Sequence, residues 1–260
     1  MLQDFALTNK LLRVVNSVAF QGSGRITKVS EAIMKLGLDQ MRAIATGLML
    51  ATLPPTRTLH PVFPEVILGT FISAVVGRNI GHLADLPNPE EVFICSMFGR
   101  LGEILTIYYF PEEYDEIVNN VRTRMTNELC ASRTVLGIGF DVLGVEVARR
   151  WNFPPNLLYA MRALPEGILA AAATERERIA HCAGFARELC DAAWRAPDSQ
   201  REWALSSLTE RYQATVPRAP KYIRAVIRHA LELGQKYCHA LNIDPTGSAL
   251  IEGLAKWGYE

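Results

Sequence analysis

Histidine is the side chain that most often ligates a catalytic metal or transfers a proton, and this chain holds only five. They are His60, His82, His181, His229 and His239. His229 and His239 are ten residues apart on one expected helix, so they point to different faces of it. We therefore expect each histidine to be a surface or hydrogen-bonded residue rather than a metal ligand.

The cysteines are equally dispersed. They are Cys95, Cys130, Cys182, Cys190 and Cys238, and no two form a CxxC pair. An odd number without paired spacing predicts reduced, mostly buried thiols. Cys182 and Cys238 each adjoin a histidine, but adjacent residues on a helix point about 100° apart, which is poor for proton transfer. Cysteine catalysis is not supported.

A group of arginines in the middle of the chain could bind an anion. The group consists of Arg122, Arg124, Arg133, Arg149 and Arg150, and Trp151 follows it directly. Arginines beside an aromatic ring could hold a nucleotide or a stretch of RNA. The alternative is a core tryptophan with solvated arginines, and the usual burial of these residue types favours it.

The glycine-rich segment Gly22-Ser23-Gly24-Arg25 resembles a phosphate loop only superficially. It follows an expected helix instead of a strand and has no lysine partner, so we interpret it as a turn. Asn16 and Ser17 precede it and could be catalytic only beside a basic partner. Helix capping or hydrogen bonding between helices is the favoured role for both.

Composition limits the classes of protein. Lysine plus arginine equals aspartate plus glutamate at 27 each, so the chain lacks the positive field of a protein that binds a phosphate backbone. No stretch approaches the roughly 18 uninterrupted apolar residues of a membrane span. Residues 66–77 come nearest, and Arg78 ends that run, so a buried core helix is expected there. Nucleic acid and membrane partners are both disfavoured.

Helix-start signals recur along the chain and indicate an all-α fold. In Asn88-Pro89-Glu90-Glu91, an N-cap residue precedes a proline and two acids, as at a helix N-terminus. Similar signals stand at Pro111, at Thr174 with Glu177, at Ser199 with Glu202, and at Asp244-Pro245. Apolar residues recur at three or four positions, and period-two alternation is almost absent. The expected helices cover residues 4–18, 28–37, 39–53, 62–82, 89–109, 112–130, 134–151, 155–163, 168–193, 199–214, 218–241 and 246–257.

Four segments together carry a resemblance to a known family. They are residues 4–17, residues 31–37, Phe93-Ile94-Cys95-Ser96-Met97-Phe98-Gly99-Arg100-Leu101-Gly102-Glu103, and residues 144–154. The chain resembles the bacterial HDOD domains, which are signalling domains related to the HD phosphohydrolases. The resemblance implies a multi-helix bundle of the HD-domain type. We expect an HDOD domain over residues 1–165 and a C-terminal helical extension, residues 166–260, packed on it.

The resemblance also implies that the metal site of the hydrolases is lost. In catalytic relatives the positions matching Gly99 and Arg100 hold a metal-binding histidine and aspartate, and the position of Phe140 often holds another histidine. A hydrogen atom, a guanidinium and a phenyl ring cannot ligate a cation. Residues 159–165 also lack the histidine pair of many relatives. We expect no metal and no other cofactor, and no catalytic residues.

Arg100 itself has two possible roles. It could bind a phosphorylated ligand without metal through bidentate contacts. It could instead form a salt bridge with an acid such as Glu103, and the general behaviour of arginine favours this role. The possible ligand or partner pocket consists of Arg100, Glu103, Phe140, Arg149 and Arg150.

The resemblance implies a non-catalytic output or regulatory domain, such as that of a two-component response regulator, which acts through protein contacts or a small ligand. One alternative is a metal-dependent phosphohydrolase that uses Glu103, Asp141 and Glu146. The other is an RNA-binding helical domain that uses the middle arginines. The implied partners are a kinase, a receiver or a cyclic-nucleotide enzyme, with a nucleotide as a possible ligand. We expect a cytoplasmic protein, and a sensory domain could precede it, since the resemblance begins almost at residue 1.

Overall fold

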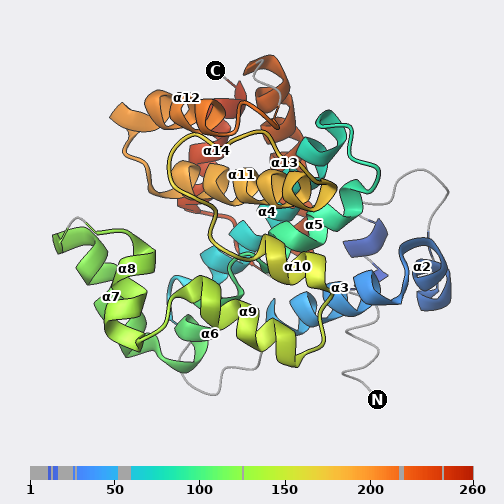
Figure 1. Cartoon of the computed structure of the whole chain (residues 1–260), viewed down its shortest axis with the longest axis horizontal. Coiled ribbons are helices and arrows are strands. Elements are labelled where there is room, and N and C mark those ends of the chain that lie inside the picture. The colour runs from blue at the N-terminus through green and yellow to red at the C-terminus, as the bar shows by residue number, and fades with distance from the viewer. Residues whose placement is uncertain are drawn as a thin grey trace.

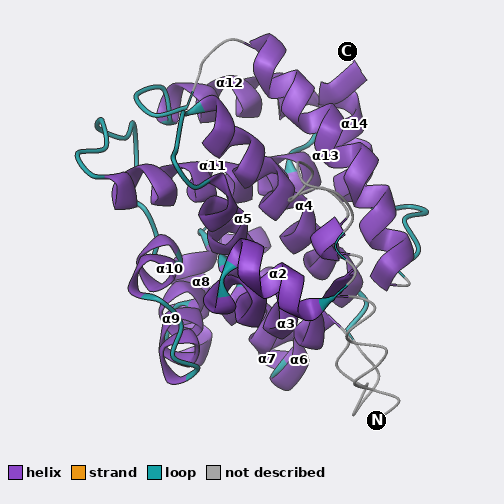
Figure 2. Cartoon of the chain, turned by 90° about the vertical axis from the view of Figure 1, so that its right-hand side faces the viewer, coloured by secondary structure: helices purple, strands orange, loops and turns teal. Residues whose placement is uncertain are grey.

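The computed structural model describes residues 11–12, 14–16, 26, 28–51, 60–124, 126–216, 220–241 and 243–259. Every regular element among them is a helix, which confirms the all-α prediction (Figure 2). In chain order they are α2 (Val29–Leu36), α3 (Leu38–Ala51), α4 (Phe63–Leu83), α5 (Pro89–Phe98), α6 (Leu101–Tyr109), α7 (Pro111–Arg124), α8 (Glu128–Leu136), α9 (Phe140–Arg150), α10 (Pro155–Ala160), α11 (Glu175–Arg195), the 3₁₀ helix η2 (Asp198–Gln200), α12 (Arg201–Arg211), α13 (Pro220–Leu241) and α14 (Ala249–Tyr259). The expected first helix, 4–18, and the turn at 22–25 lie largely outside the described residues.

Helix α4 forms the centre of the molecule. Nearly all of its residues from Phe63 to Gly77 are buried, as a helix that is apolar on every side requires. It packs against α5, α11 and α13 (Figure 1). By length and composition, α4 and the stretch Pro89–Tyr109 could each cross a membrane, but 78% of either apolar window is buried among other helices. The position of both in the core accounts for their hydropathy.

The C-terminal helices pack on the same centre. Helix α11 contacts α4, α5 and α10, and α14 fills the angle between α11 and α13. Glu65 of α4 accepts hydrogen bonds from the Ser248 hydroxyl (3.0 Å) and the Leu250 amide (2.8 Å), so the N-terminus of α14 is bound to the central helix. One continuous hydrophobic core therefore includes helices from both the N-terminal and C-terminal parts of the chain.

Two expected helices are divided differently in the structure. The expected helix 89–109 is broken at Gly99 and Arg100, where α5 ends and α6 begins. The expected helices 112–130 and 134–151 are wrong in their boundaries, because α8 forms a separate short helix between them. Asn127 caps α8 by accepting a hydrogen bond from the Cys130 amide (2.8 Å), and Gly137 ends it with φ of +74°.

The capping signals have mixed outcomes. Thr174 and Glu177 form the expected capping box, with both hydrogen bonds present, and this box starts α11 at Glu175 instead of residue 168. The expected box of Ser199 with Glu202 is wrong, because Ser199 lies within η2 and α12 begins at Arg201 without a side-chain cap. Asn16 has a structural role, since its side chain bonds both the carbonyl and the amide of Ile26 at 2.7 Å.

Helices α6 and α9 cross with their backbones in contact. A Cβ atom on Gly102 would stand 1.9 Å from the carbonyl oxygen of Phe140, and one on Gly144 would stand 2.9 Å from the amide nitrogen of Gly102. Only glycine permits this approach. The crossing brings the start of α9 against α6, close to the break at Arg100.

We expect Gly102→Ala to lower the free energy of unfolding by about 3 kcal/mol or more, because the new methyl group meets backbone that cannot move aside. The matched control is Gly69→Ala in α4, where the nearest atom, Leu250 Cδ2, is 3.4 Å away. That change should stay within about 1 kcal/mol of the wild type. Urea denaturation measures both, and equal stabilities of the two variants would contradict the crossing.

Candidate functional site

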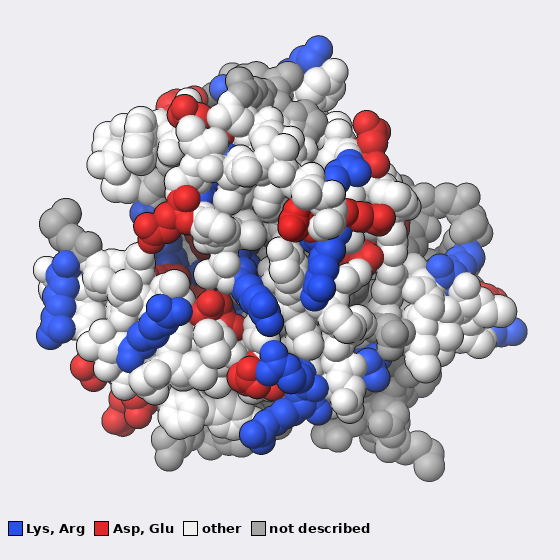
Figure 3. All heavy atoms as spheres, in the orientation of Figure 1, with Lys and Arg blue, Asp and Glu red and all other residues white. Residues whose placement is uncertain are grey.

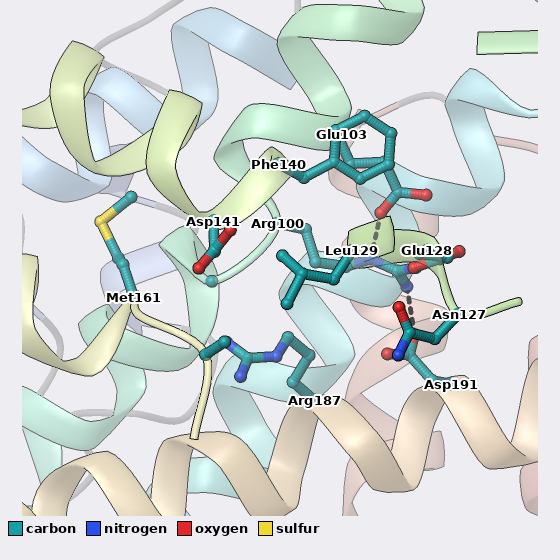
Figure 4. A pocket seen from close by; sticks show the side chains of 12 residues that line it. Arg100, Glu103, Asn127, Glu128, Leu129, Phe140, Asp141, Met161, Arg187 and Asp191 are labelled. Atoms are coloured by element: carbon teal, nitrogen blue, oxygen red, sulfur yellow. Dashed lines mark hydrogen bonds and ion pairs between the residues drawn. The ribbon is translucent and has the colours of Figure 1, made fainter. Parts of the chain in front are cut away.

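The break between α5 and α6 directs the side chain of Arg100 into the protein. The residue is 5% exposed, and Glu103, one helical turn later, is 3% exposed. A cavity of about 310 Å³ borders both residues and is also lined by the start of α8, the start of α9 and the side of α11 (Figure 4). The cavity lies where the sequence places the candidate pocket.

Arg100 is held by two carboxylates from different helices. Its Nε donates to Glu103 Oε2 at 2.7 Å, and its Nη1 lies 2.7 Å from Asp191 Oδ1 of α11. Its Cζ atom also lies 5.3 Å from the centre of the Trp194 ring. A buried guanidinium needs such compensation, because an isolated charge in the protein interior is strongly unfavourable.

Glu103 extends this pair into a network. Its Oε1 accepts hydrogen bonds from Arg195 Nη2 (3.1 Å) and from the Tyr114 hydroxyl (3.2 Å). Arg195 in turn pairs with Glu128 at the start of α8. The network therefore joins α6, α7, α8 and α11 and contains two guanidinium groups and three carboxylates.

The network shifts the acidity of its members. Burial favours the neutral form of Glu103, but the charges of Arg100 and Arg195, with the hydrogen bonds from Arg100 and Tyr114, outweigh it and lower the pKa. For Asp191 burial prevails over the attraction of Arg100 and raises the pKa. Asp191 keeps 30% of its side-chain surface exposed to the cavity, so water there moderates the effect. Burial and Glu103 together raise the pKa of the Tyr114 hydroxyl.

The comparisons with known proteins agree with this architecture. The HDOD domain family matches residues 1–165. The chain belongs to the HDOD domain family. An HDOD domain protein of unknown function from Geobacter sulfurreducens has a similar structure, with a TM-score of 0.64 and 19% identity over 92% of this chain and 83% of that one.

A second solved structure, a candidate phosphohydrolase from Shewanella amazonensis SB2B, has a TM-score of 0.61 and 19% identity over 97% of this chain and 84% of that one. At this identity the likeness shows the fold alone. An uncharacterised protein of Treponema pallidum (strain Nichols) is 23% identical over 164 residues, which are 62% of this chain. This chain matches 31% of the length of that relative. The expected HDOD resemblance and the HD-type helical fold are confirmed.

The residues of this HDOD site do not suit a divalent cation. At the positions that the resemblance matches to metal ligands, Gly99 offers no side chain, Arg100 is itself a cation, and Phe140 has no donor atom. The nearest carboxylates, Glu103 and Asp191, already neutralise Arg100. Within the described part of the chain, no three histidine, cysteine, aspartate or glutamate side chains cluster as metal ligands would.

The structure brings together three of the five expected pocket residues. Arg100, Glu103 and Phe140 line the cavity, whereas Arg149 and Arg150 lie exposed at the end of α9 and do not. Arg149 pairs there with Glu146, which does not line the cavity. The trio Glu103, Asp141 and Glu146 therefore does not converge on one point.

The middle arginines do not surround a ligand site. Trp151 is half-buried and packs edge-on against Phe153, with ring centres 5.9 Å apart, while Arg122, Arg133, Arg149 and Arg150 are exposed. Acidic and basic side chains are mixed across the face of the molecule seen in Figure 3. The tryptophan packs against the hydrophobic core from a half-buried position, beside exposed arginines.

Histidines and cysteines match expectation where they are described. His60 bonds Asp115 at 3.0 Å, His181 bonds Thr215 at 2.9 Å, His229 bonds Asn79 at 2.9 Å, and His82 is exposed. The side chain of His239 lies outside the described residues. All five cysteines are free, and only Cys130 is exposed.

Sequence reasoning missed the contribution of α11 to the site. Arg187, Asp191 and Arg195 stand four residues apart and share one helix face, and this face meets the α5–α6 break. Alternating charges at that spacing are typical of a solvated helix face, so the sequence did not indicate that this face meets Arg100 and Glu103. Tyr114 and Glu128 gave no comparable signal.

Glu103 should make the stability of the protein depend on pH. Its lowered pKa means that the ionised form stabilises the fold above the ordinary value of 4.5, and this contribution is lost as the pH falls through the folded-state pKa. We expect Glu103→Gln to lower the free energy of unfolding by about 3–5 kcal/mol at neutral pH, because it leaves buried guanidinium groups under-compensated. The difference from the wild type should shrink below pH 4.5.

Urea denaturation over a series of pH values checks this expectation. Glu146→Gln is the matched control, since its pair with Arg149 is exposed and contributes less than about 1 kcal/mol. A difference between Glu103→Gln and wild type that stays constant over the acidic range would show that Glu103 is not the titrating group.

Proposed function

We propose that this HDOD protein is a non-catalytic output or regulatory domain of bacterial signal transduction, of the kind found in a response regulator. The observation that carries the proposal is the buried Arg100, which occupies the position of a metal ligand and is neutralised by Glu103 and Asp191. A divalent cation at this point would face the repulsion of a guanidinium that is almost fully buried. The scaffold would then act through contacts with a partner or a small ligand.

Similarity to a solved structure supports the proposed signalling role. One similar structure is a candidate signal transduction protein from Marinobacter aquaeolei VT8, with a TM-score of 0.57 over 92% of this chain and 53% of that one. The proposed partner is a kinase, a receiver or a cyclic-nucleotide enzyme. We propose that the protein meets this partner in the cytoplasm.

The alternative function is that of a metal-dependent phosphohydrolase. The fold of the Shewanella protein is compatible with it. It would require ligands other than Gly99, Arg100 and Phe140. Glu146 does not line the cavity with Glu103 and Asp141, and among the described residues these three do not form a group that could hold a metal. The RNA-binding alternative has less support, because acidic side chains lie among the exposed arginines and would repel a phosphate backbone.

Metal analysis of the purified protein tests the proposal. We expect substoichiometric iron, manganese, zinc and magnesium, and no hydrolysis of bis(p-nitrophenyl) phosphate with or without added Mn²⁺. Stoichiometric metal, or hydrolysis that EDTA abolishes, would overturn the non-catalytic assignment.

Replacing the guanidinium should change the response to cations. Arg100→Asp leaves Glu103 and Asp191 beside a new carboxylate, so the variant should be less stable by about 3–5 kcal/mol. Millimolar Mn²⁺ should then raise its Tm, because a cation that binds only the folded state stabilises it. The Tm of the wild type and of Arg149→Asp, an exposed arginine outside the cavity, should not change. A wild-type Tm that rises with Mn²⁺ would count against the proposal.

A further inference from the structure

A second hollow, of about 370 Å³, lies beside the buried network and reaches the surface. One wall is a face of α7, where Tyr114, Ile117, Val118 and Val121 recur at helical spacing. Another wall is formed by Trp194 at the end of α11. Val118 is 45% exposed, so an apolar part of this lining is open to solvent. We call this hollow the α7–α11 groove.

The charges at the rim of the α7–α11 groove are paired, with one exception. His60 bonds Asp115 at 3.0 Å, and Arg195 pairs with Glu128. Arg122 also lines the groove, and it bonds only the neutral side-chain amide three residues earlier, at 3.3 Å. No carboxylate in the described part of the chain forms an ion pair with it. The groove therefore combines an apolar surface with a positive charge that lacks a counter-ion.

Helix α12 carries the complementary features. Trp203 is 70% exposed, which is more than any other aromatic side chain that the structure describes. Glu202 and Glu210 are also exposed, and their spacing of two turns places them near Trp203 on one side of the helix. Both arginines of α12 pair with other carboxylates, so among the described residues these two glutamates have no basic partner. An exposed tryptophan beside unpaired acids suits an apolar groove with an unpaired arginine.

The groove and α12 lie on the same side of the molecule. The end of α11 lines the groove, and α12 begins at Arg201, shortly after Arg195. In Figure 1, α12, α7 and α8 all lie toward the left of the view. Trp203 is exposed, so it does not enter the groove of its own chain. A two-fold axis through this side would place α12 of each of two chains against the groove of the other.

We propose that two copies of this chain form a two-fold symmetric dimer, in which Trp203 of each copy enters the α7–α11 groove of the other. Glu202 and Glu210 then lie toward Arg122 of the second copy. Each contact combines a buried aromatic side chain with charge pairs at its edge, which is the composition of interface hot spots. The contact occurs twice in the dimer because of the symmetry. The inference goes beyond the proposed function and does not depend on it.

Sedimentation velocity of the purified protein, from about 1 μM to about 1 mM, is the first test. We expect a monomer–dimer equilibrium, and Trp203→Ala should weaken the dimer by about a hundredfold, because both copies of the tryptophan are lost. Tyr259→Ala in α14 is the matched control, since that side chain is 69% exposed and lies outside both contact surfaces. A protein that stays monomeric over this range, or a dimer that Trp203→Ala leaves unchanged, would overturn the inference.

An exchange of charges tests which surfaces meet. Arg122→Glu should weaken the dimer by about tenfold, because two charge pairs are lost and replaced by repulsion. The double variant Glu202→Arg with Glu210→Arg should have a similar effect. The protein with all three changes should recover association, since opposite charges face each other again. Arg149→Glu is the control, because that arginine is exposed outside the groove. A triple variant that associates no better than Arg122→Glu would overturn the pairing of α12 with the groove.

Mixing two defective variants tests whether the contact is reciprocal. Val118→Asp places a charge in the groove at an exposed position, and Trp203→Ala leaves the groove intact but removes the side chain that enters it. An equimolar mixture should associate more tightly than either variant alone, because the tryptophan of one chain fits the groove of the other. Circular dichroism establishes that each variant is folded. A mixture that associates no better than its components would overturn the reciprocal arrangement.

Discussion

The structure depends on a buried positive charge. The guanidinium of Arg100 has almost no contact with solvent, so carboxylates must be supplied from within the protein. Glu103 supplies one from the next helical turn, and Asp191 supplies the other from α11, which is 91 residues later in the chain. The need to neutralise one side chain thus fixes the position of α11 against the α5–α6 break.

On the proposed function, this internal cation takes the electrostatic place of a metal. A bound cation and a buried guanidinium both hold carboxylates from separate helices at one point. They differ in chemistry, because a guanidinium can neither activate water nor accept a phosphoryl oxygen as a ligand in the manner of a metal. A scaffold of this kind can keep its packing while it loses hydrolysis. The buried pair of Arg100 and Glu103, with the partly exposed Asp191, Arg195 and Glu128 around it, is then a structural requirement first.

The sequence was sufficient for the fold class because its signals are local. Apolar spacing predicted α4 and α13, and capping residues predicted the capping box of Thr174 with Glu177. The expected salt bridge between Arg100 and Glu103 is also confirmed, because residues three apart on a helix can reach each other. The break at Gly99 was not predictable in the same way, because it depends on the close contact of Gly102 with Phe140 of another helix. The pairing with Asp191 and the position of Arg187 also depend on tertiary packing. Local patterns therefore identified the centre of the site and one of its partners, and not the helix that completes it.

Helix α11 also contributes two charged side chains, Arg187 and Asp191, to the lining of the cavity. Arg187 lies one turn before Asp191, and its charge lowers the pKa that burial raises in that carboxyl. Without the charge of Arg187, Asp191 would hold a proton more readily and its attraction for Arg100 would weaken. Arg100 would then depend more on Glu103, which is shared with Arg195 and Tyr114. The charge of Arg187 is therefore coupled, through one face of α11, to the contacts that hold α6, α7 and α8 together.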